Sequence, residues 1–167
     1  LQSTPGEGTR VWFSLPLVAA QDGMGSPTEP PQVPTRAGRV VVVEDNEVNR
    51  QVLSELLSSL GMTVRSAPDG ALGVELVQQI RPDMVLMDIR MPGIDGIEAT
   101  RRIRSAEAAE GQEQVPIIAL TADVEIGRVS AYGEAGMNGL QAKPVTRAQL
   151  AQLLESWLPA EPSSRVK

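Results

Sequence analysis

The chain has 167 residues, a net charge of −6, and neither cysteine nor histidine. Its length suits one compact domain with tails, and its charge argues against nucleic-acid or membrane-surface binding. The missing residue types exclude disulfides, thiol chemistry, imidazole catalysis and a phosphohistidine within this chain. No apolar stretch approaches the ~20 residues of a membrane-spanning helix, and the first residues lack the pattern of a signal peptide.

The first part of the chain differs in composition from the rest. Residues 1–17 begin as if cut from a longer protein and contain a short strand-like piece, VWFSLP at 11–16. Residues 18–38 are rich in Pro, Gly, Ser and Thr and have few apolar residues to bury, which predicts a flexible linker. At the other end, residues 159–167 are expected to form a polar tail.

Between residues 39 and 158, strand and helix patterns alternate, which predicts an α/β fold with a five-stranded parallel sheet and five helices. Buried apolar runs of the kind found here are typical of parallel strands, and right-handed crossovers would cover both faces of the sheet. The predicted strands are RVVVVED at 39–45, MTVRS at 62–66, PDMVLMD at 82–88, VPIIALTA at 115–122 and GLQAKP at 139–144.

The helix after the first strand is predicted from apolar residues that recur every four places. Its predicted buried stripe comprises Val48, Val52, Leu56 and Leu60, widened by Leu53 and Leu57. The segment 107–114, EAAEGQEQ, is expected to be a polar loop. The other helices are predicted from Asp69-Gly70 to about Ile80, from near Ile97 to near Arg104, from about Val124 to Ala135, and after a capping box that begins at Thr146.

Polar residues follow the ends of four predicted strands: Glu44-Asp45, Asp88, Thr121 and Lys143. The carboxyl ends of parallel strands share one crevice, so these side chains are expected to converge. Three neighbouring carboxylates repel one another unless a cation neutralises them or a pKa rises. Mg²⁺ fits, because it takes carboxylate, water and phosphate oxygens.

Asp88 is the candidate nucleophile, because a carboxylate can attack phosphorus and form an aspartyl phosphate. Lys143 would neutralise a phosphoryl oxygen, the Thr121 hydroxyl would donate to another and drive a switch, and the Arg90 backbone carbonyl would complete the metal shell. Simpler interpretations stay open: strand-end acids serve as helix caps, most lysines are solvated, and a strand-end threonine is usually structural. The Lys143-Pro144 bond is a candidate for the cis form.

Residues 39–158 resemble the receiver domain of a two-component response regulator, of the kind fused to hybrid sensor histidine kinases. The resemblance implies a doubly wound, flavodoxin-like sheet in the order 2-1-3-4-5 and a cytoplasmic phosphorelay protein. It also implies a phosphoryl group taken from phosphohistidine of a kinase or a histidine phosphotransfer domain, followed by slow autodephosphorylation. The matching motifs are VVVEDNEVNRQVL, PDMVLMDIRMPGIDGIEATRRIR, PIIALTA and AGMNGLQAKPV. The implied site comprises Asp88 as phosphoacceptor, Mg²⁺ on Glu44, Asp45, Asp88 and the Arg90 carbonyl, the Thr121 switch and the Lys143 contact.

Residues 6–16, GEGTRVWFSLP, resemble the last strand of a histidine kinase ATP-binding domain, so residues 1–17 are expected to be a remnant of one, without kinase activity. Leu140 departs from the receiver pattern, because many receivers carry Tyr or Phe three residues before the lysine. In such receivers that ring changes its burial as the threonine moves, whereas Leu140 offers neither a ring nor a hydroxyl for this part of the switch. Arg90 and Asp123 occupy positions that tune dephosphorylation in such domains.

Two other functional classes stay open. One is a receiver-like interaction module that is never phosphorylated, against which the three acids and Lys143 argue. The other is a phosphatase with an aspartyl nucleophile, but such enzymes typically place a second acid where this chain has Arg90. No P-loop pattern supports direct nucleotide binding.

Overall fold

The computed structural model describes residues 2–4, 8–10, 38–122 and 129–158, and the chain divides into two units, residues 1–32 and 33–167. In the first unit, β1 (Gln2–Thr4) and β2 (Gly8–Arg10) pair as an antiparallel hairpin. The strand predicted at 11–16, the predicted polar tail and all of the predicted linker except Gly38 lie outside the described residues.

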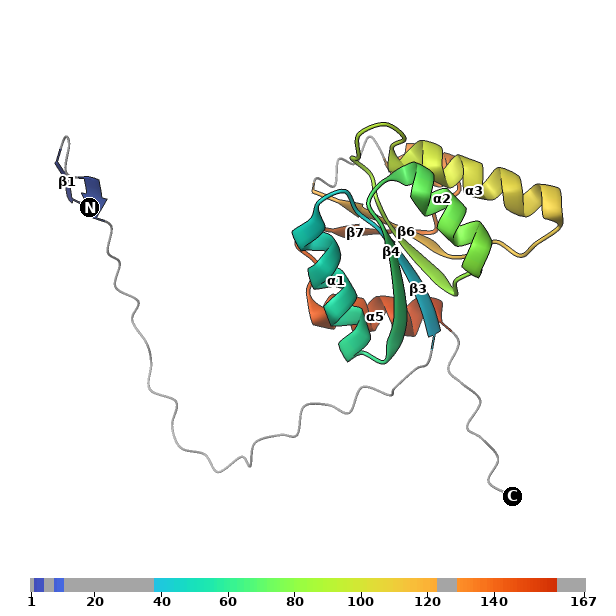
Figure 1. Ribbon diagram of the computed structural model, residues 1–167, viewed down its shortest axis with the longest axis horizontal. Helices are drawn as coiled ribbons and strands as arrows, with labels where there is room; N and C mark the ends of the chain where they lie inside the picture. Colours follow the sequence, from blue (N-terminus) through green and yellow to red (C-terminus); the bar gives the residue numbers. More distant parts are fainter. Residues whose placement is uncertain (1, 5–7, 11–37, 123–128, 159–167) are drawn as a thin grey trace, which may run out of the picture. The chain divides into compact units, whose positions relative to one another are not determined.

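The second unit contains a five-stranded parallel sheet with the strand order β4-β3-β5-β6-β7 (Figure 1). Numbered within this sheet, the order is 2-1-3-4-5, so the predicted doubly wound topology is confirmed. Every residue of the two central strands β5 and β6 is buried, as their continuous apolar runs predicted. The strands are β3 (Gly38–Val43), β4 (Met62–Ala67), β5 (Met84–Asp88), β6 (Ile117–Thr121) and β7 (Gly139–Ala142).

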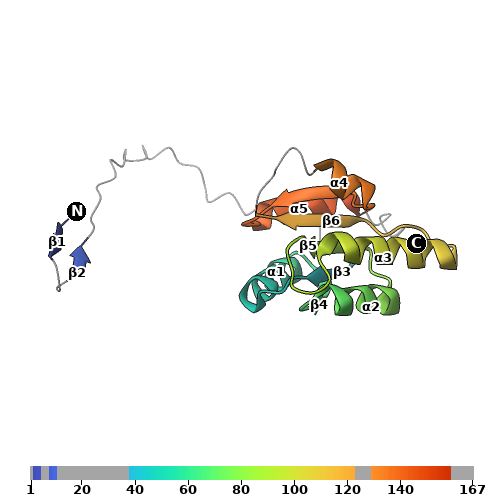
Figure 2. The ribbon, with the colours of Figure 1, turned by 90° about the horizontal axis from the view of Figure 1, so that it is seen from above.

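Helices cover both faces of this sheet, as Figure 1 and Figure 2 show. Alternate strand residues point to opposite faces, so Val41 and Val43 pack with α2, α3 and α4, whereas Val40 and Val42 pack with α1 and α5. The helices are α1 (Glu47–Ser59), α2 (Gly70–Ile80), α3 (Gly96–Glu110), α4 (Val129–Glu134) and α5 (Arg147–Trp157). Among the described residues, no helix combines the length and apolar character needed to cross a membrane.

The predicted buried stripe of α1 was partly wrong. Val48 and Val52 are 68% and 46% exposed, whereas Leu53, Leu57 and Leu60 are buried against the sheet. A residue every four places drifts round a helix of 3.6 residues per turn by roughly 40° at each step. The series therefore starts on the solvent side at Val48 and becomes buried against the sheet only at Leu60, and the buried face centres on the leucines.

The predicted end of the third helix was also wrong, because α3 continues to Glu110 through part of the segment expected to be a loop. Alanines at 106, 108 and 109 favour the helix. Glu107 is buried, with its carboxylate accepting hydrogen bonds from Arg104 at 2.6 Å and from the Val115 backbone at 2.9 Å. Gly111 ends the helix in the left-handed conformation, with a φ of 63°.

Two other helix boundaries bear on the predictions. The described part of α4 begins at Val129, so the predicted start near Val124 lies outside the described residues. The capping box of α5 is confirmed: Thr146 Oγ1 accepts from the Gln149 backbone, and the Gln149 side chain accepts from the Thr146 backbone. This box fixes the start of α5 just after the end of β7.

Candidate phosphoacceptor site

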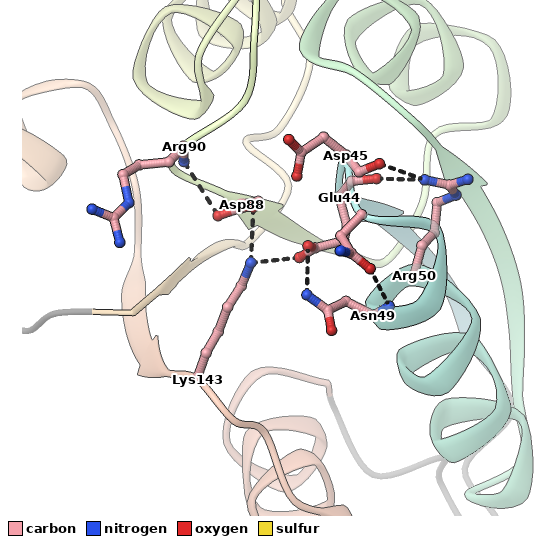
Figure 3. A network of polar contacts seen from close by, with 8 residues as sticks. Glu44, Asp45, Asn49, Arg50, Asp88, Arg90 and Lys143 are labelled. Atoms are coloured by element: carbon pink, nitrogen blue, oxygen red, sulfur yellow. Dashed lines mark hydrogen bonds and ion pairs between the residues drawn. The ribbon is translucent and has the colours of Figure 1, made fainter. Parts of the chain in front are cut away.

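Strand register brings the predicted site residues to one edge of the sheet. Val43 pairs with Met87, and Thr121 pairs with Ala142, so the strands end at matching levels. Glu44 and Asp45 directly follow β3, Asp88 is the last residue of β5, and Lys143 directly follows β7. Figure 3 shows the carboxylates of Glu44 and Asp88 meeting the ammonium of Lys143 at this edge.

The three acids form a compact cluster. One carboxylate oxygen from each of Glu44, Asp45 and Asp88 lies within 4.8 Å of the others. Glu44 and Asp88 are buried, and Asp45 is exposed to solvent. A set of three carboxylates at this spacing suits a small divalent cation that prefers oxygen ligands, such as Mg²⁺.

Lys143 joins two of these carboxylates. Its Nζ lies 2.6 Å from Glu44 Oε2 and 2.8 Å from Asp88 Oδ2. Burial lowers the pKa of Lys143, but the hydrogen bonds and negative charges of Asp88 and Glu44 outweigh this and raise that pKa above its usual value. The ammonium is therefore charged at neutral pH and can neutralise a phosphoryl oxygen beside Asp88. The following Lys143-Pro144 bond is cis.

The Asp88 carboxylate is held at both of its oxygens. Oδ2 pairs with Lys143 at 2.8 Å, and Oδ1 accepts a hydrogen bond from the Arg90 backbone N–H at 3.2 Å. The loop that carries Arg90 folds closely back on the strand end, since a Cβ added to Gly96 would lie 2.1 Å from the Asp88 carbonyl oxygen. A metal contact from the Arg90 carbonyl stays a prediction.

Thr121 is buried at the end of β6, and its carbonyl accepts a hydrogen bond from the Lys143 backbone N–H at 2.7 Å. The backbone thus connects the proposed switch residue to the lysine, while the role of its hydroxyl stays a prediction. Leu140 is partly buried and packs against the core on the α2–α3 side of the sheet. Asp123 lies outside the described residues.

Two residues in the first turn of α1, which the sequence did not predict as part of the site, contact Glu44. Asn49 Nδ2 donates to Glu44 Oε1 at 3.1 Å, and Arg50 Nη1 donates to the Glu44 carbonyl at 2.8 Å (Figure 3). Side chains on a helix lean toward its N-terminus, which here begins three residues after Glu44. The motif EDNEVNR contained this signal, because the helix it predicts starts at the strand end that carries the acids.

A cleft of about 340 Å³ opens beside the acidic cluster. Glu44 and Lys143 contribute to its polar part, and Val52, Pro144 and Val145 to its apolar part. The exposed face of α1 thus borders the site directly.

The fold and the site define a phosphoacceptor domain of the doubly wound type, and the comparisons with known proteins agree. The chain belongs to the response regulator receiver domain family, whose model matches residues 40–155. The domain serves two-component phosphorelays, as the sequence motifs predicted.

The chain is similar to the sensor protein GacS of Pseudomonas syringae pv. syringae, with 36% identity over 157 residues; the match covers 94% of this chain and 17% of the relative. Among solved structures, it is similar to the receiver domain of the sensor histidine kinase PA1611 from Pseudomonas aeruginosa, which has a magnesium ion coordinated in its active-site cleft. The identity is 42% and the TM-score 0.64, covering 73% of this chain and 98% of that one.

A third similar structure is the complex of the Saccharomyces cerevisiae histidine phosphotransfer protein Ypd1 with the receiver domain of Ssk1. Here the identity is 28% and the TM-score 0.68, covering 71% of this chain and 87% of that one.

Proposed function

We propose that this chain takes a phosphoryl group from phosphohistidine onto Asp88 and thereby changes conformation. The observation that carries the proposal is the position of Lys143, whose ammonium lies 2.8 Å from Asp88 and 2.6 Å from Glu44 beside a three-carboxylate cluster. Glu44, Asp45, Asp88 and the Arg90 carbonyl would hold Mg²⁺, which neutralises phosphoryl charge when bound. The magnesium in the PA1611 receiver supports this assignment.

The chemistry is an in-line displacement at phosphorus. A carboxylate oxygen of Asp88 attacks, the new O–P bond forms, and the P–N bond to the donor imidazole breaks. The electron pair stays on the imidazole nitrogen, which takes up a proton from solvent. Lys143 shifts from the carboxylate to a phosphoryl oxygen, and the Thr121 hydroxyl donates to another, which moves the segment that follows β6.

The donor is a phosphohistidine on another domain or protein, because these 167 residues contain no histidine. The Ssk1 receiver in complex with a histidine phosphotransfer protein supports a donor of that kind. We propose that this exchange takes place in the cytoplasm and involves neither nucleic acid nor a membrane contact of this chain.

We also propose that residues 39–158 are the receiver domain, that 18–38 are a linker and that 159–167 are a polar tail. Residues 1–17 are proposed as the end of a kinase ATP-binding domain, on the strength of GEGTRVWFSLP. The 157-residue match to GacS supports this, since it extends beyond the receiver model.

Incubation with acetyl phosphate and Mg²⁺, followed by intact-mass measurement, tests the proposal. Wild type is expected to gain one labile phosphate, and Asp88→Asn none, because an amide cannot form the acyl phosphate. Asp83→Asn is the matched control, since Asp83 is an exposed carboxylate just before the opposite end of β5. An unmodified wild type would favour an interaction module, and continuous turnover of acetyl phosphate would favour a phosphatase.

A further inference from the structure

We infer that Asn49 is a positioning residue of the phosphoacceptor site and acts through Glu44. The inference rests on the proposed function and adds a residue to its machinery. Asn49 Nδ2 donates to Glu44 Oε1 at 3.1 Å, while Lys143 Nζ occupies the other oxygen, Oε2, at 2.6 Å (Figure 3). The two carboxylate oxygens therefore have different donors, an amide on one side and an ammonium on the other.

The separate donors to the two carboxylate oxygens matter because Glu44 is only 1% exposed. A buried carboxylate depends on protein donors for its orientation, and the loss of one leaves a charged acceptor unsatisfied. Without the Asn49 amide, Glu44 can rotate and present both oxygens to Lys143. That rotation draws the ammonium toward Glu44 and away from Asp88, which it now contacts at 2.8 Å.

The helix start holds Asn49 in the required place. Its backbone N–H donates to the side chain of the N-cap residue Asn46 at 3.1 Å. The next residue, Arg50, donates from Nη1 to the Glu44 carbonyl at 2.8 Å. The first turn of α1 is thus fixed to the end of β3, and the short Asn49 side chain needs little ordering to reach Glu44.

Residues that orient metal-binding carboxylates have measurable effects on the metal. Their substitution typically lowers metal affinity or activity by about 10- to 100-fold. For Asn49, we expect an effect near the lower end of that range, because its side chain is exposed to solvent. We therefore expect Asn49→Ala to weaken Mg²⁺ binding roughly tenfold and to slow phosphorylation by acetyl phosphate by a similar factor at low Mg²⁺.

The experiment measures Mg²⁺ affinity by titration calorimetry and the phosphorylation rate by intact mass, for Asn49→Ala and for the near-isosteric Asn49→Leu. Both variants lack the donor, so both are expected to show the same loss. Gln51→Ala is the matched control: Gln51 is an exposed amide on the same helix, and it donates to Glu55 at 2.9 Å, away from the site. It is expected to match wild type in both measurements.

A double-mutant cycle with Glu44→Gln separates positioning from a general effect on the helix. If Asn49 acts through the Glu44 carboxylate, Asn49→Ala has little further effect on Mg²⁺ affinity in the Glu44→Gln background. An equal loss in both backgrounds, or wild-type affinity and rate in Asn49→Ala, would overturn this inference but leave the proposed function intact. Failure of wild type to take up phosphate at any Mg²⁺ concentration would overturn the proposed function and this inference together.

Discussion

At the scale of single residues, charge compensation dominates the site. Glu44, Asp45 and Asp88 bring three carboxylates together, and Lys143 contacts two of them. One ammonium cannot neutralise three carboxylates, and repulsion between like charges in a partly buried cluster lowers the stability of the native state. The site therefore retains a net negative charge, which a bound divalent cation would neutralise.

This net negative charge predicts how Asp88→Asn changes the stabilisation of the protein by Mg²⁺. A ligand that binds only the native state stabilises it by RT ln(1 + [L]/Kd), so Mg²⁺ at 100 times Kd raises the free energy of unfolding of wild type by about 2.7 kcal/mol. The variant lacks one carboxylate, and we expect a clearly smaller increase. In EDTA, it should be at least as stable as wild type, because one negative charge has gone.

Thermal melts of both proteins in EDTA and at several Mg²⁺ concentrations provide the measurement. Asp83→Asn, with its carboxylate outside the cluster, should retain the wild-type response. Equal Mg²⁺-induced shifts in wild type and Asp88→Asn would show that Asp88 does not belong to the metal site.

At the scale of elements, α1 has two separate roles. Its leucines bury against the sheet, while Val48 and Val52 stay exposed, and Val52 lines the cleft at the site. Single exposed valines are ordinary on protein surfaces. Two of them one turn apart, the second lining the cleft beside Glu44 and Lys143, are a candidate contact for the proposed phosphohistidine donor.

We therefore expect Val48→Ser combined with Val52→Ser to slow transfer from a phosphorylated histidine phosphotransfer protein. Loss of two partly buried apolar contacts of about 1 kcal/mol each corresponds to a reduction of more than tenfold. Phosphorylation by acetyl phosphate should not change, because that small donor does not need the surface. Leu72→Ser is the control, since Leu72 is 46% exposed on α2, on the other face of the sheet; equal slowing by this variant would argue against a role for α1.

The C-terminal half of α3 is joined to the segment between α4 and β7 by one side chain. Arg104 donates to the carbonyls of Gly136 and Val115, to Asn138 Oδ1 and to Glu107, whose ion pair with it is 2.6 Å long. Both side chains of this pair are about nine-tenths buried. Arg104 thus links three segments of the chain in an environment with little water.

Arg104→Ala is expected to lower the free energy of unfolding by about 3–5 kcal/mol, since it leaves Glu107 buried without its cation. Arg102→Ala provides a matched control on the same helix. Arg102 forms an exposed pair with Glu98 at 2.9 Å, and such a pair contributes about 0.3–0.5 kcal/mol. Urea unfolding measures both, and similar small losses would show that the Arg104 network does not stabilise the fold.

These elements also show what the sequence reveals and what it leaves hidden. The strands β3, β5 and β6 were predictable because each contains a continuous apolar run, and the polar residues at or just after the strand ends located the acids and Lys143. The buried face of α1 was not predictable, because its six apolar residues occupy more than one side of the helix. Only packing against the sheet decides which of them are buried. The extension of α3 depends on a buried Arg104–Glu107 pair, and residues 107–114 contain only polar and small residues that also suit a loop. Asn49 and Arg50 were not predicted as site residues, because amides and arginines on a first helical turn are usually solvated.

At the scale of the whole molecule, phosphorylation is expected to act on the half of the sheet that contains β6 and β7. The Thr121 carbonyl already binds the Lys143 backbone, and β7 follows α4 directly in the chain. Movement of Thr121 toward a phosphoryl group should therefore displace α4 and β7 together. Leu140 offers no ring to change its burial, so the expected response is a modest shift between populations.

Beryllofluoride, which stands in for the phosphoryl group, allows this to be measured by NMR. Amide shifts are expected from residues 129–145, and Thr121→Ala should abolish most of them while Asp88 still binds the analogue. Thr100→Ala is a comparison, because Thr100 is a buried threonine whose hydroxyl binds the Gly96 carbonyl within α3. Shifts confined to the loop after Asp88 in wild type would contradict the coupling.

The Glu44–Lys143 ion pair joins residues that are 99 positions apart, and Asp88 comes from between them. Partly folded chains that have not yet docked β7 hold the acids without the lysine, and chains in which β3 is not in place lack Glu44 and Asp45 at the site. During synthesis, the lysine is also the last of these groups to leave the ribosome. On the proposed function, an acceptor site forms only when β3, β5 and β7 are in place together, so a partly assembled copy is expected to take up no phosphate from the donor.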